Sequence, residues 1–325
     1  MNQEKMYCGI DVSAETLDIC YQTQNGGMQN LKVKNNKQGF AQILKYCPEN
    51  FHFVMEATGV YHLQLVFFLN ENTQAFSVVN ALQIKRYIQM HLERNKSDKK
   101  DAKRICEYGI ERHPAVYEMP DSAYFECRSL NNTIEDLTKE ITKISNQIHS
   151  LKKVPYDASI VIKSYQSIIK KLQLEKSKIE KELLVKLQNW QPELLKQVQS
   201  VKGIGKRASS ELIIYTKAFK GMENYRQLIS YAGLSPVEYS SGTSIKGRTK
   251  ICKQGGKQLR HILYMGALNA MKTNVACKAL YERLVANGKN KKVAIIAVCN
   301  KLLKQVFGCV KNGTLYQDNY IKNLC

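Results

Sequence analysis

The segment KMYCGIDVS (residues 5–13) is followed by TLDICYQT (residues 16–23), a glycine pair at Gly26 and Gly27, and MQNLKVK (residues 28–34). The three segments are rich in apolar side chains, and a glycine pair is typical of a tight turn between antiparallel strands. These residues therefore predict that the chain opens with an antiparallel strand hairpin.

The next part of the chain alternates helical and strand-like segments. We expect helices at Lys37–Tyr46 and Tyr61–Asn70, strands at Phe51–Met55 and Ala75–Val79, and a long helical stretch at Ala81–Glu111. Leading strands followed by alternating helices are typical of a three-layer α/β domain.

A heptad pattern follows. Its apolar residues are spaced alternately by four and three, and they are Leu130, Ile134, Leu137, Ile141, Ile144, Ile148 and Leu151. After Pro155 the spacing returns, with Lys176 as an interruption, at Ile162, Tyr165, Ile169, Leu172, Ile179 and Leu183. Narrow apolar seams of this kind predict coiled-coil helices. They would pair with each other across Pro155, with another subunit, or both.

The charge of the chain is strongly asymmetric. The 325 residues carry a net charge of +21, and Val201–Cys325 holds 22 lysines and arginines against 5 acidic residues, which places +17 in this stretch. Such a distribution indicates a polyanionic partner, most simply DNA or RNA. The alternative is a surface that only maintains solubility, but such surfaces usually mix both signs.

The ten cysteines are scattered, without a C-x-x-C pair. That pattern favours a reducing cytosol over a disulfide framework or a zinc site. We find no signal-peptide pattern, and apolar runs such as VAIIAVC (residues 293–299) are too short to span a bilayer. We expect a soluble intracellular protein with no membrane partner.

The stretch LLKQVQSVKGIGKRASSELI (residues 194–213) fits a helix-hairpin-helix. Small residues in the hairpin let backbone amides approach a phosphate, and the N-terminus of the following helix is electropositive. The alternative is that the glycines only form the turn. The basic flanks favour binding of a nucleic-acid backbone by Lys202, Gly203, Gly205, Lys206 and Arg207.

Four carboxylates in the first third of the chain have an order typical of a two-metal phosphodiester site. Asp11 lies in the apolar run YCGIDVS, and Glu56 ends the run FHFVM. Asp98 and Asp101 are three apart in a helical segment, so they project from one face. Magnesium prefers hard oxygen ligands, and two such ions can hold the attacking and leaving oxygens of a phosphate.

Each acid alone has a structural alternative. Asp11 fits a cap of the turn that follows it, and Glu56 fits a loop acid at a strand end. The helical pair fits a solvated face with ion pairs to Lys99, Lys100 and Lys103. The four together, on a strand–strand–helix framework in a basic protein, favour the metal site.

The stretch GLSPVEYSSGTSIKGRTKICKQGGKQLRHIL (residues 233–263) joins a serine-rich loop to a run of cations. The cations expected to contact nucleic acid are Lys246, Arg248, Lys253, Lys257 and Arg260. A serine needs a base or a metal to become a nucleophile, and neither histidine nor carboxylate adjoins Ser241. By its residues alone the loop is a phosphate-binding lid. A tyrosine nucleophile at Tyr239 or Tyr264 would leave the four acids unexplained.

Several segments in this order carry a resemblance that covers nearly the whole chain. They are GIDVSAETLD, VMEATGVYHLQL, KSDKKDA, SVKGIGKRASSELI, and AGLSPVEYSSG followed by ICKQGGKQLRHIL. With them the chain resembles the DEDD-type transposases of the insertion-sequence-110 family, relatives of the Piv-type DNA invertases. The resemblance implies a RuvC-like (ribonuclease H-like) α/β domain at residues 1–122 and a coiled-coil linker for oligomerisation at residues 123–189. It also implies a mainly α-helical C-terminal transposase domain with a helix-hairpin-helix at residues 190–325.

The resemblance also implies roles for single residues. It assigns metal binding and catalysis to Asp11, Glu56, Asp98 and Asp101. In the family motif P-x-x-Y-x-S-G the serine before the glycine is the nucleophile, which falls on Ser241 and not on its neighbour Ser240.

The activity implied is that of a transposase, a site-specific DNA recombinase. The serine would attack a DNA phosphodiester, with the help of two Mg²⁺ ions for which Mn²⁺ can substitute, and form a phosphoserine link. The implied partners are donor and target DNA, a structured noncoding bridge RNA as guide, and copies of the chain in a dimer or tetramer. The implied location is a bacterial-type cytoplasm, at the nucleoid when DNA is bound. The alternatives are a RuvC-like structure-selective endonuclease that uses metal-activated water, and a non-enzymatic nucleic-acid scaffold.

Overall fold

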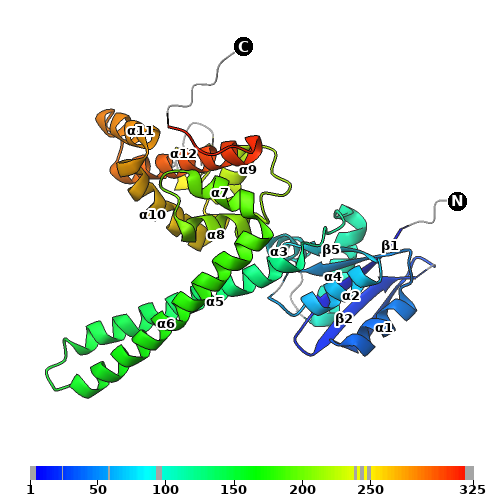
Figure 1. The fold of residues 1–325 in the computed structure, drawn as a ribbon. Helices are drawn as coiled ribbons and strands as arrows, with labels where there is room; N and C mark the ends of the chain where they lie inside the picture. Colours follow the sequence, from blue (N-terminus) through cyan, green and yellow to red (C-terminus); the bar gives the residue numbers. More distant parts are fainter. Residues whose placement is uncertain are drawn as a thin grey trace, which may run out of the picture. The chain divides into compact units, whose positions relative to one another are not determined.

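The computed structural model describes residues 5–318 except 24, 58, 93–96, 238–239, 242–244 and 247–249. The side chains of residues 238–249 also lie outside the description. The chain divides into two compact units, Met1–Met119 and Pro120–Cys325 (Figure 1). The finer division at residues 122 and 189 stays a prediction.

The first unit is built on one mixed sheet of five strands in the order β3-β2-β1-β4-β5. Strands β1 (Met6–Val12), β2 (Thr16–Gln22) and β3 (Met28–Lys34) form an antiparallel meander. Strands β4 (Phe51–Glu56) and β5 (Ala75–Val79) continue the sheet in parallel with β1. This order and these directions are those of the ribonuclease H-like fold, so the predicted α/β class is confirmed.

Helices cover both faces of the sheet. On one face α1 (Lys37–Tyr46) and α2 (Leu63–Glu71) pack over a core that includes Ile10 and other alternate residues of the strands. On the other face α3 (Ala81–Met90) and α4 (Asp98–Arg112) contribute to a second, smaller core. The three layers predicted from the sequence are therefore present.

One expectation for this unit was wrong. The single helical stretch expected at Ala81–Glu111 is two helices, since α3 ends at Met90 and α4 begins at Asp98. His91 caps α3, and Leu92 has a backbone φ of 53°, a left-handed conformation that cannot continue a right-handed helix. Ser97 then caps α4 by accepting a hydrogen bond from the amide of Lys100.

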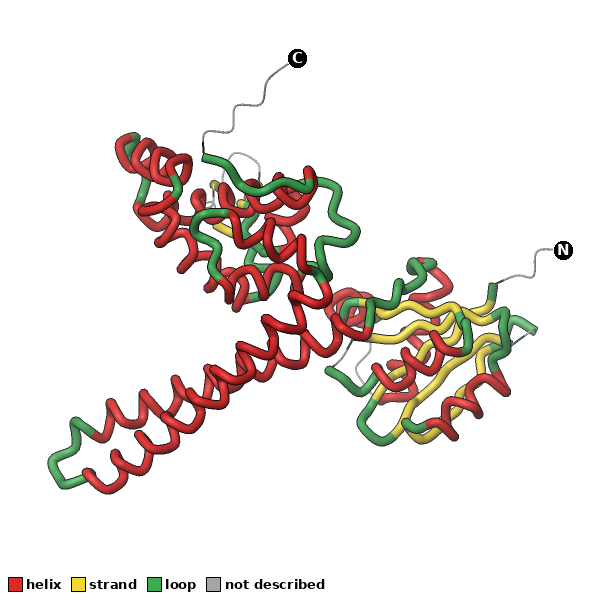
Figure 2. Tube along the Cα trace, in the orientation of Figure 1, coloured by secondary structure: helices red, strands yellow, loops and turns green. Residues whose placement is uncertain are grey.

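The second unit begins with a long helical hairpin. Helix α5 (Ser122–Leu151) and helix α6 (Ser159–Trp190) pack along each other, as the tube in Figure 2 shows. Ile134 and Ile148 of α5 and Leu183 of α6 are buried seam residues. Among the pairings left open by the heptads, pairing within the chain is therefore observed.

The rest of the second unit is mainly helical, as predicted. Its helices are α7 (Pro192–Ser200), α8 (Lys206–Tyr215), α9 (Tyr225–Tyr231), α10 (Lys257–Thr273), α11 (Val275–Ala286) and α12 (Lys291–Asn312). Four two-residue strands lie between α9 and α10, namely β6 (Pro236–Val237), β7 (Ser240–Ser241), β8 (Ile245–Lys246) and β9 (Lys250–Ile251). The body of the unit encloses one apolar core.

The run VAIIAVC is part of a longer helix than its own length suggested. Helix α12 has 22 residues and is the one helix in the described part of the chain with the length and composition to cross a membrane. Its side chains at Val298, Leu302, Leu303 and Val306 are completely buried in the core of the second unit. Packing within the protein therefore accounts for its apolar character.

Candidate metal site and nucleic-acid interface

The sheet register places Asp11 and Glu56 side by side. Strands β1 and β4 are parallel, and their last paired residues are Ile10 and Met55, so the next residue of each strand is one of the two acids. Because side chains alternate along a strand, both acids lie on the face that Val54 presents to α4. Two predicted metal ligands thus end adjacent strands on one face of the sheet.

Helix α4 packs directly on β1 because residue 9 is glycine. A Cβ atom built on Gly9 would lie 2.1 Å from the backbone nitrogen of Cys106 and 2.5 Å from the carbonyl oxygen of Ala102. No side chain fits in that space, so the helix axis approaches the central strand more closely than any other residue would allow.

The direction of α4 follows from its contacts. Gly109 lies against the ring of Tyr7, whereas residues nearer the start of the helix lie against the next position on the same face of β1. The helix is therefore antiparallel to the strand. Its first turn, which carries Asp98 and Asp101, lies toward the end of β1 that carries Asp11.

The pKa of Asp11 indicates that the other acids are near it. Its pKa is raised to about 6, first because the carboxyl is partly buried and then because the charges of Asp101, Asp98, Glu56 and Asp18 repel its ionised form. All four predicted carboxylates therefore contribute to one electrostatic site.

A fifth acid, Asp18, was not among the residues predicted from the sequence. It pairs with Asp11 in the antiparallel register of β1 and β2, and its side chain is 14% exposed. Lys32 lies opposite Asp18 on β3, and its Nζ is 2.9 Å from Asp18 Oδ2. This lysine neutralises Asp18. Asp18 and Lys32 could have been found from the sequence by pairing the residues of the three strands outward from the two turns that join them.

The structural alternative for Asp11 was a cap on the following turn. Ser13 fills that role instead, because its hydroxyl donates to the carbonyl of Thr16 at 2.8 Å and accepts from the amide of Thr16 at 3.1 Å. The carboxylate of Asp11 is therefore not needed to close the turn.

The donors present fit a divalent cation in their chemistry. They are hard carboxylate oxygens, and a cation would favour the ionised form of Asp11, whose pKa is raised by burial and then by the charges of the other acids. Among the residues that the structure describes, no three or more His, Cys, Asp or Glu side chains are yet close enough to hold one ion. Binding of one ion would therefore require these carboxylates to move closer together.

The serine loop in the second unit contains two short antiparallel strand pairs, one within the other along the chain. The outer pair joins β6 to β9, and the inner pair joins β7 to β8 with Ser240 opposite Lys246 and Ser241 opposite Ile245. The backbone of Ser241 therefore lies near the tip of the loop. The side chains of β7 and β8, and all of Arg248, lie outside the described part of the chain.

The base of the loop is fixed by a glycine and an arginine. Gly255 has a φ of +139°, and a Cβ there would lie 2.4 Å from the carbonyl oxygen of Tyr231. Arg260 Nη1 donates to the carbonyl of Gly255 at 2.9 Å and to that of Ala232 at 3.3 Å. Arg260, expected from the sequence to contact nucleic acid, thus also holds the two ends of the loop together.

The predicted helix-hairpin-helix consists of α7, a short connection and α8. Gly203 has a φ of +107°, and a Cβ there would lie 2.6 Å from the Cβ of Ala270, so packing requires this glycine. Gly205 precedes the first residue of α8 and has open space where a side chain would lie. Only Gly205 leaves room for a ligand to approach the backbone.

The cations around this hairpin differ in availability. Lys202 forms an ion pair with Asp318. Arg207 donates to Asn131 of α5 and pairs with the buried Glu211 at 3.3 Å, so it joins the hairpin to the coiled coil. The predicted cations that are exposed and described in full are Lys202, Lys206, Lys253 and Lys257.

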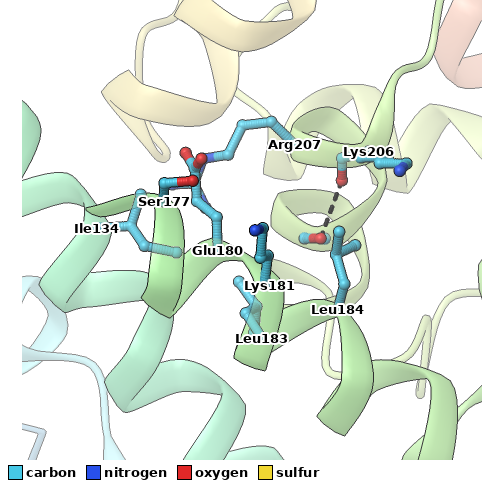
Figure 3. A pocket seen from close by; sticks show the side chains of 9 residues that line it. Ile134, Ser177, Glu180, Lys181, Leu183, Leu184, Lys206 and Arg207 are labelled. Carbon is cyan, nitrogen blue, oxygen red and sulfur yellow. Dashed lines mark hydrogen bonds between the residues drawn. The ribbon is translucent and has the colours of Figure 1, made fainter. Parts of the chain in front are cut away.

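A cavity of about 210 Å³ lies beside the first turn of α8 (Figure 3). Its lining residues are Ile134, Ser177, Glu180, Lys181, Leu183, Leu184, Lys206, Arg207 and Ser210. Ser210, one of the lining residues, donates its hydroxyl to the carbonyl of Lys206 at 2.9 Å. The lining mixes apolar side chains with charges of both signs, which is not typical of a phosphate site.

Comparisons with known proteins agree with this geometry. A DEDD-type IS110 family model described as "Transposase" matches residues 8–153, and a model described as "Transposase IS116/IS110/IS902 family" matches residues 195–282. Two curated relatives are the "Pilin gene-inverting protein" of Moraxella lacunata, 29% identical, and that of Moraxella bovis, 28% identical. Each alignment covers 95% of this chain and 97% of the relative. An IS110 insertion-element protein of Streptomyces coelicolor is 29% identical over 37% of this chain and 29% of its own length.

Proposed function

The chain belongs to the IS110 family of DEDD transposases, enzymes that cleave DNA and transfer strands, and we propose that it cuts and rejoins DNA through a covalent link to Ser241. The observation that carries the proposal is that Glu56, Asp98 and Asp101 lie near enough to Asp11 for their charges to raise its pKa. Carboxylates that repel one another disfavour the fold, so a cluster of them is better explained by binding of a cation than by stability.

Asp11, Glu56, Asp98 and Asp101 are the residues that would hold the divalent metal that this family uses. We infer Mg²⁺, most simply two ions, with Mn²⁺ as a substitute. When bound, the metal supplies positive charge to stabilise the negative charge that develops on a phosphate during cleavage. The protein contributes the ligand order, and the close packing of α4 on Gly9 brings the helical pair of acids toward the strand pair.

Ser241 is the proposed nucleophile. Its Oγ forms a bond to the phosphorus of a DNA phosphodiester, and the bond from phosphorus to the 3′ oxygen breaks. The serine hydroxyl loses one proton, and the leaving 3′ oxygen gains one to become a 3′-hydroxyl. The strand end then stays attached to the protein as a phosphoserine ester. Attack by another 3′-hydroxyl reverses the step and rejoins DNA, without loss of bond energy to hydrolysis.

The exposed lysines at residues 206, 253 and 257 would position the DNA backbone. Specificity would come from a structured noncoding RNA that pairs with donor and target DNA. When base pairing recognises the sequence, the protein contacts mainly the backbone and shape of the nucleic acid. We further propose that the chain works in the cytoplasm as a dimer or tetramer. The long hairpin of α5 and α6 is the element suited to assembly.

Replacement of the nucleophile tests the proposal. Ser241→Ala should abolish strand cleavage and the covalent protein–DNA adduct on a denaturing gel, while nucleic-acid affinity changes less than two-fold or so. Ser240→Ala is the matched control, one residue away in the same strand, and should retain the adduct. Recombination by Ser241→Ala would refute the nucleophile.

The alternative is a structure-selective endonuclease in which water attacks the phosphate and the serine loop only binds DNA. The observation in its favour is that all four acids lie in the ribonuclease H-like unit, whereas Ser241 lies in the other unit. The same gel distinguishes the two functions, because the endonuclease would leave free ends and no adduct in the wild type.

A further inference from the structure

Two large apolar side chains stand in solvent beside the acid-bearing strand ends. They belong to the segment Gly59–His62, which follows β4, and they are Val60 at 63% exposed and Tyr61 at 53% exposed. An aromatic ring in this place suits the flat face of a nucleobase.

Asn35 fixes this segment against the turn that follows Asp11. Its side-chain Nδ2 donates to the carbonyl of Ser13 at 2.8 Å and to the carbonyl of Tyr61 at 3.1 Å. Its backbone amide donates to the carbonyl of Glu15 at 2.8 Å. Since one nitrogen serves both side-chain bonds, the carbonyl oxygens of Ser13 and Tyr61 are at most about 6 Å apart.

This bridge places the backbone of Tyr61 close to the acids. Ser13 is two residues after Asp11, a span of at most about 7 Å along the chain. Tyr61 is five residues after Glu56, which ends the neighbouring strand. The ring therefore projects from a backbone that is anchored at the edge where both strand acids lie.

We propose that Tyr61 stacks on an unpaired nucleobase next to the phosphate held at the acid site, and that Asn35 is the positioning residue that keeps Tyr61 there. The proposal rests on the proposed function, because it assumes that DNA lies along this edge. Stacking is tolerant of sequence because every base has an aromatic face. A segment held by the Asn35 side chain also loses little freedom when the base arrives, which favours binding.

Photochemical cross-linking of the full chain tests the stacking. The probe is a single-stranded mixed-sequence DNA oligonucleotide in which thymines are replaced by 5-iodouracil, with Ca²⁺ in place of Mg²⁺ so that the strand stays intact. We expect a cross-linked peptide with the adduct on Tyr61. Tyr61→Ala should reduce the affinity for the oligonucleotide by about ten-fold, and Tyr61→Phe should retain it.

Tyr46→Ala is the matched control, because Tyr46 is 50% exposed at the end of α1 in the same unit. It should bind and cross-link as the wild type does. If Tyr61→Ala bound with wild-type affinity, or the adducts formed on other residues, the stacking role would be wrong.

The positioning role has a separate readout. Asn35→Ala should lower the yield of the adduct on Tyr61 several-fold, whereas Asn30→Ala, at an exposed site on β3, should not. An unchanged yield with Asn35→Ala would overturn the role of Asn35. A separate variant tests the proposed function. Asp11→Asn should abolish cleavage and leave the Tyr61 adduct in place. Cleavage by Asp11→Asn would refute the function and not the stacking.

Discussion

Asp11 lies where three structural constraints meet. It lies near the end of the central strand, it is on the face that α4 covers, and the charges of the other acids act on it. The raised pKa means that the folded chain holds this proton more tightly than the unfolded chain does. The contribution of Asp11 to stability is therefore greatest below about pH 4, and it is lost as the pH rises through about 6.

The variant Asp11→Asn should be more stable than the wild type in metal-free buffer at pH 7.5. Removal of the repelled charge should add about 1 kcal/mol, since partial exposure screens the repulsion. Thermal unfolding at several pH values measures this, and the difference should vanish near pH 4. Asp136→Asn, at an exposed site on α5, should have little effect at any pH. A destabilised Asp11→Asn variant at pH 7.5 would contradict the assignment of uncompensated charge.

At the scale of elements, the site depends on how α4 lies on β1. The sequence was sufficient to predict the five strands of the first unit, the helical character of the segment that carries Asp98 and Asp101, and the two coiled-coil helices, because their apolar periods are strong. It did not predict the short strands β6 to β9. It did not reveal the break near Leu92, since α3 and α4 have a continuous helical composition. It also did not reveal that Arg207 and Arg260 bind protein groups, because the spacing of cations says nothing of their partners.

Gly9→Ala should displace α4 from the sheet. A Cβ would lie within 2.1 Å of the helix backbone, so we expect a loss of about 3 kcal/mol in the free energy of unfolding and weaker metal binding. Chemical denaturation measures the first effect. Gly308→Ala in α12 is the control, since a Cβ there meets nothing within 4 Å and alanine favours a helix. Equal stability of Gly9→Ala and the wild type would refute the close packing.

At the scale of the whole molecule, the chain separates its charges. The carboxylates of the site lie in the first unit, whereas +17 of the net charge of +21 lies at Val201–Cys325 in the second. The first unit has the fold and the carboxylates for metal, and the basic second unit has the serine loop and the surface for a polyanion. Family membership and charge therefore agree on DNA as substrate.

The most direct test of the account counts the metal ions that the full chain binds. Electron paramagnetic resonance of Mn²⁺ at pH 7.5 measures bound against free ion. We expect about two ions per chain in the wild type and at least ten-fold weaker binding in variants that neutralise one acid each. These variants are Asp11→Asn, Glu56→Gln, Asp98→Asn and Asp101→Asn. The control Asp136→Asn should bind as the wild type does. Wild-type Mn²⁺ binding by all four neutralised variants would contradict the convergence of these carboxylates on one metal site.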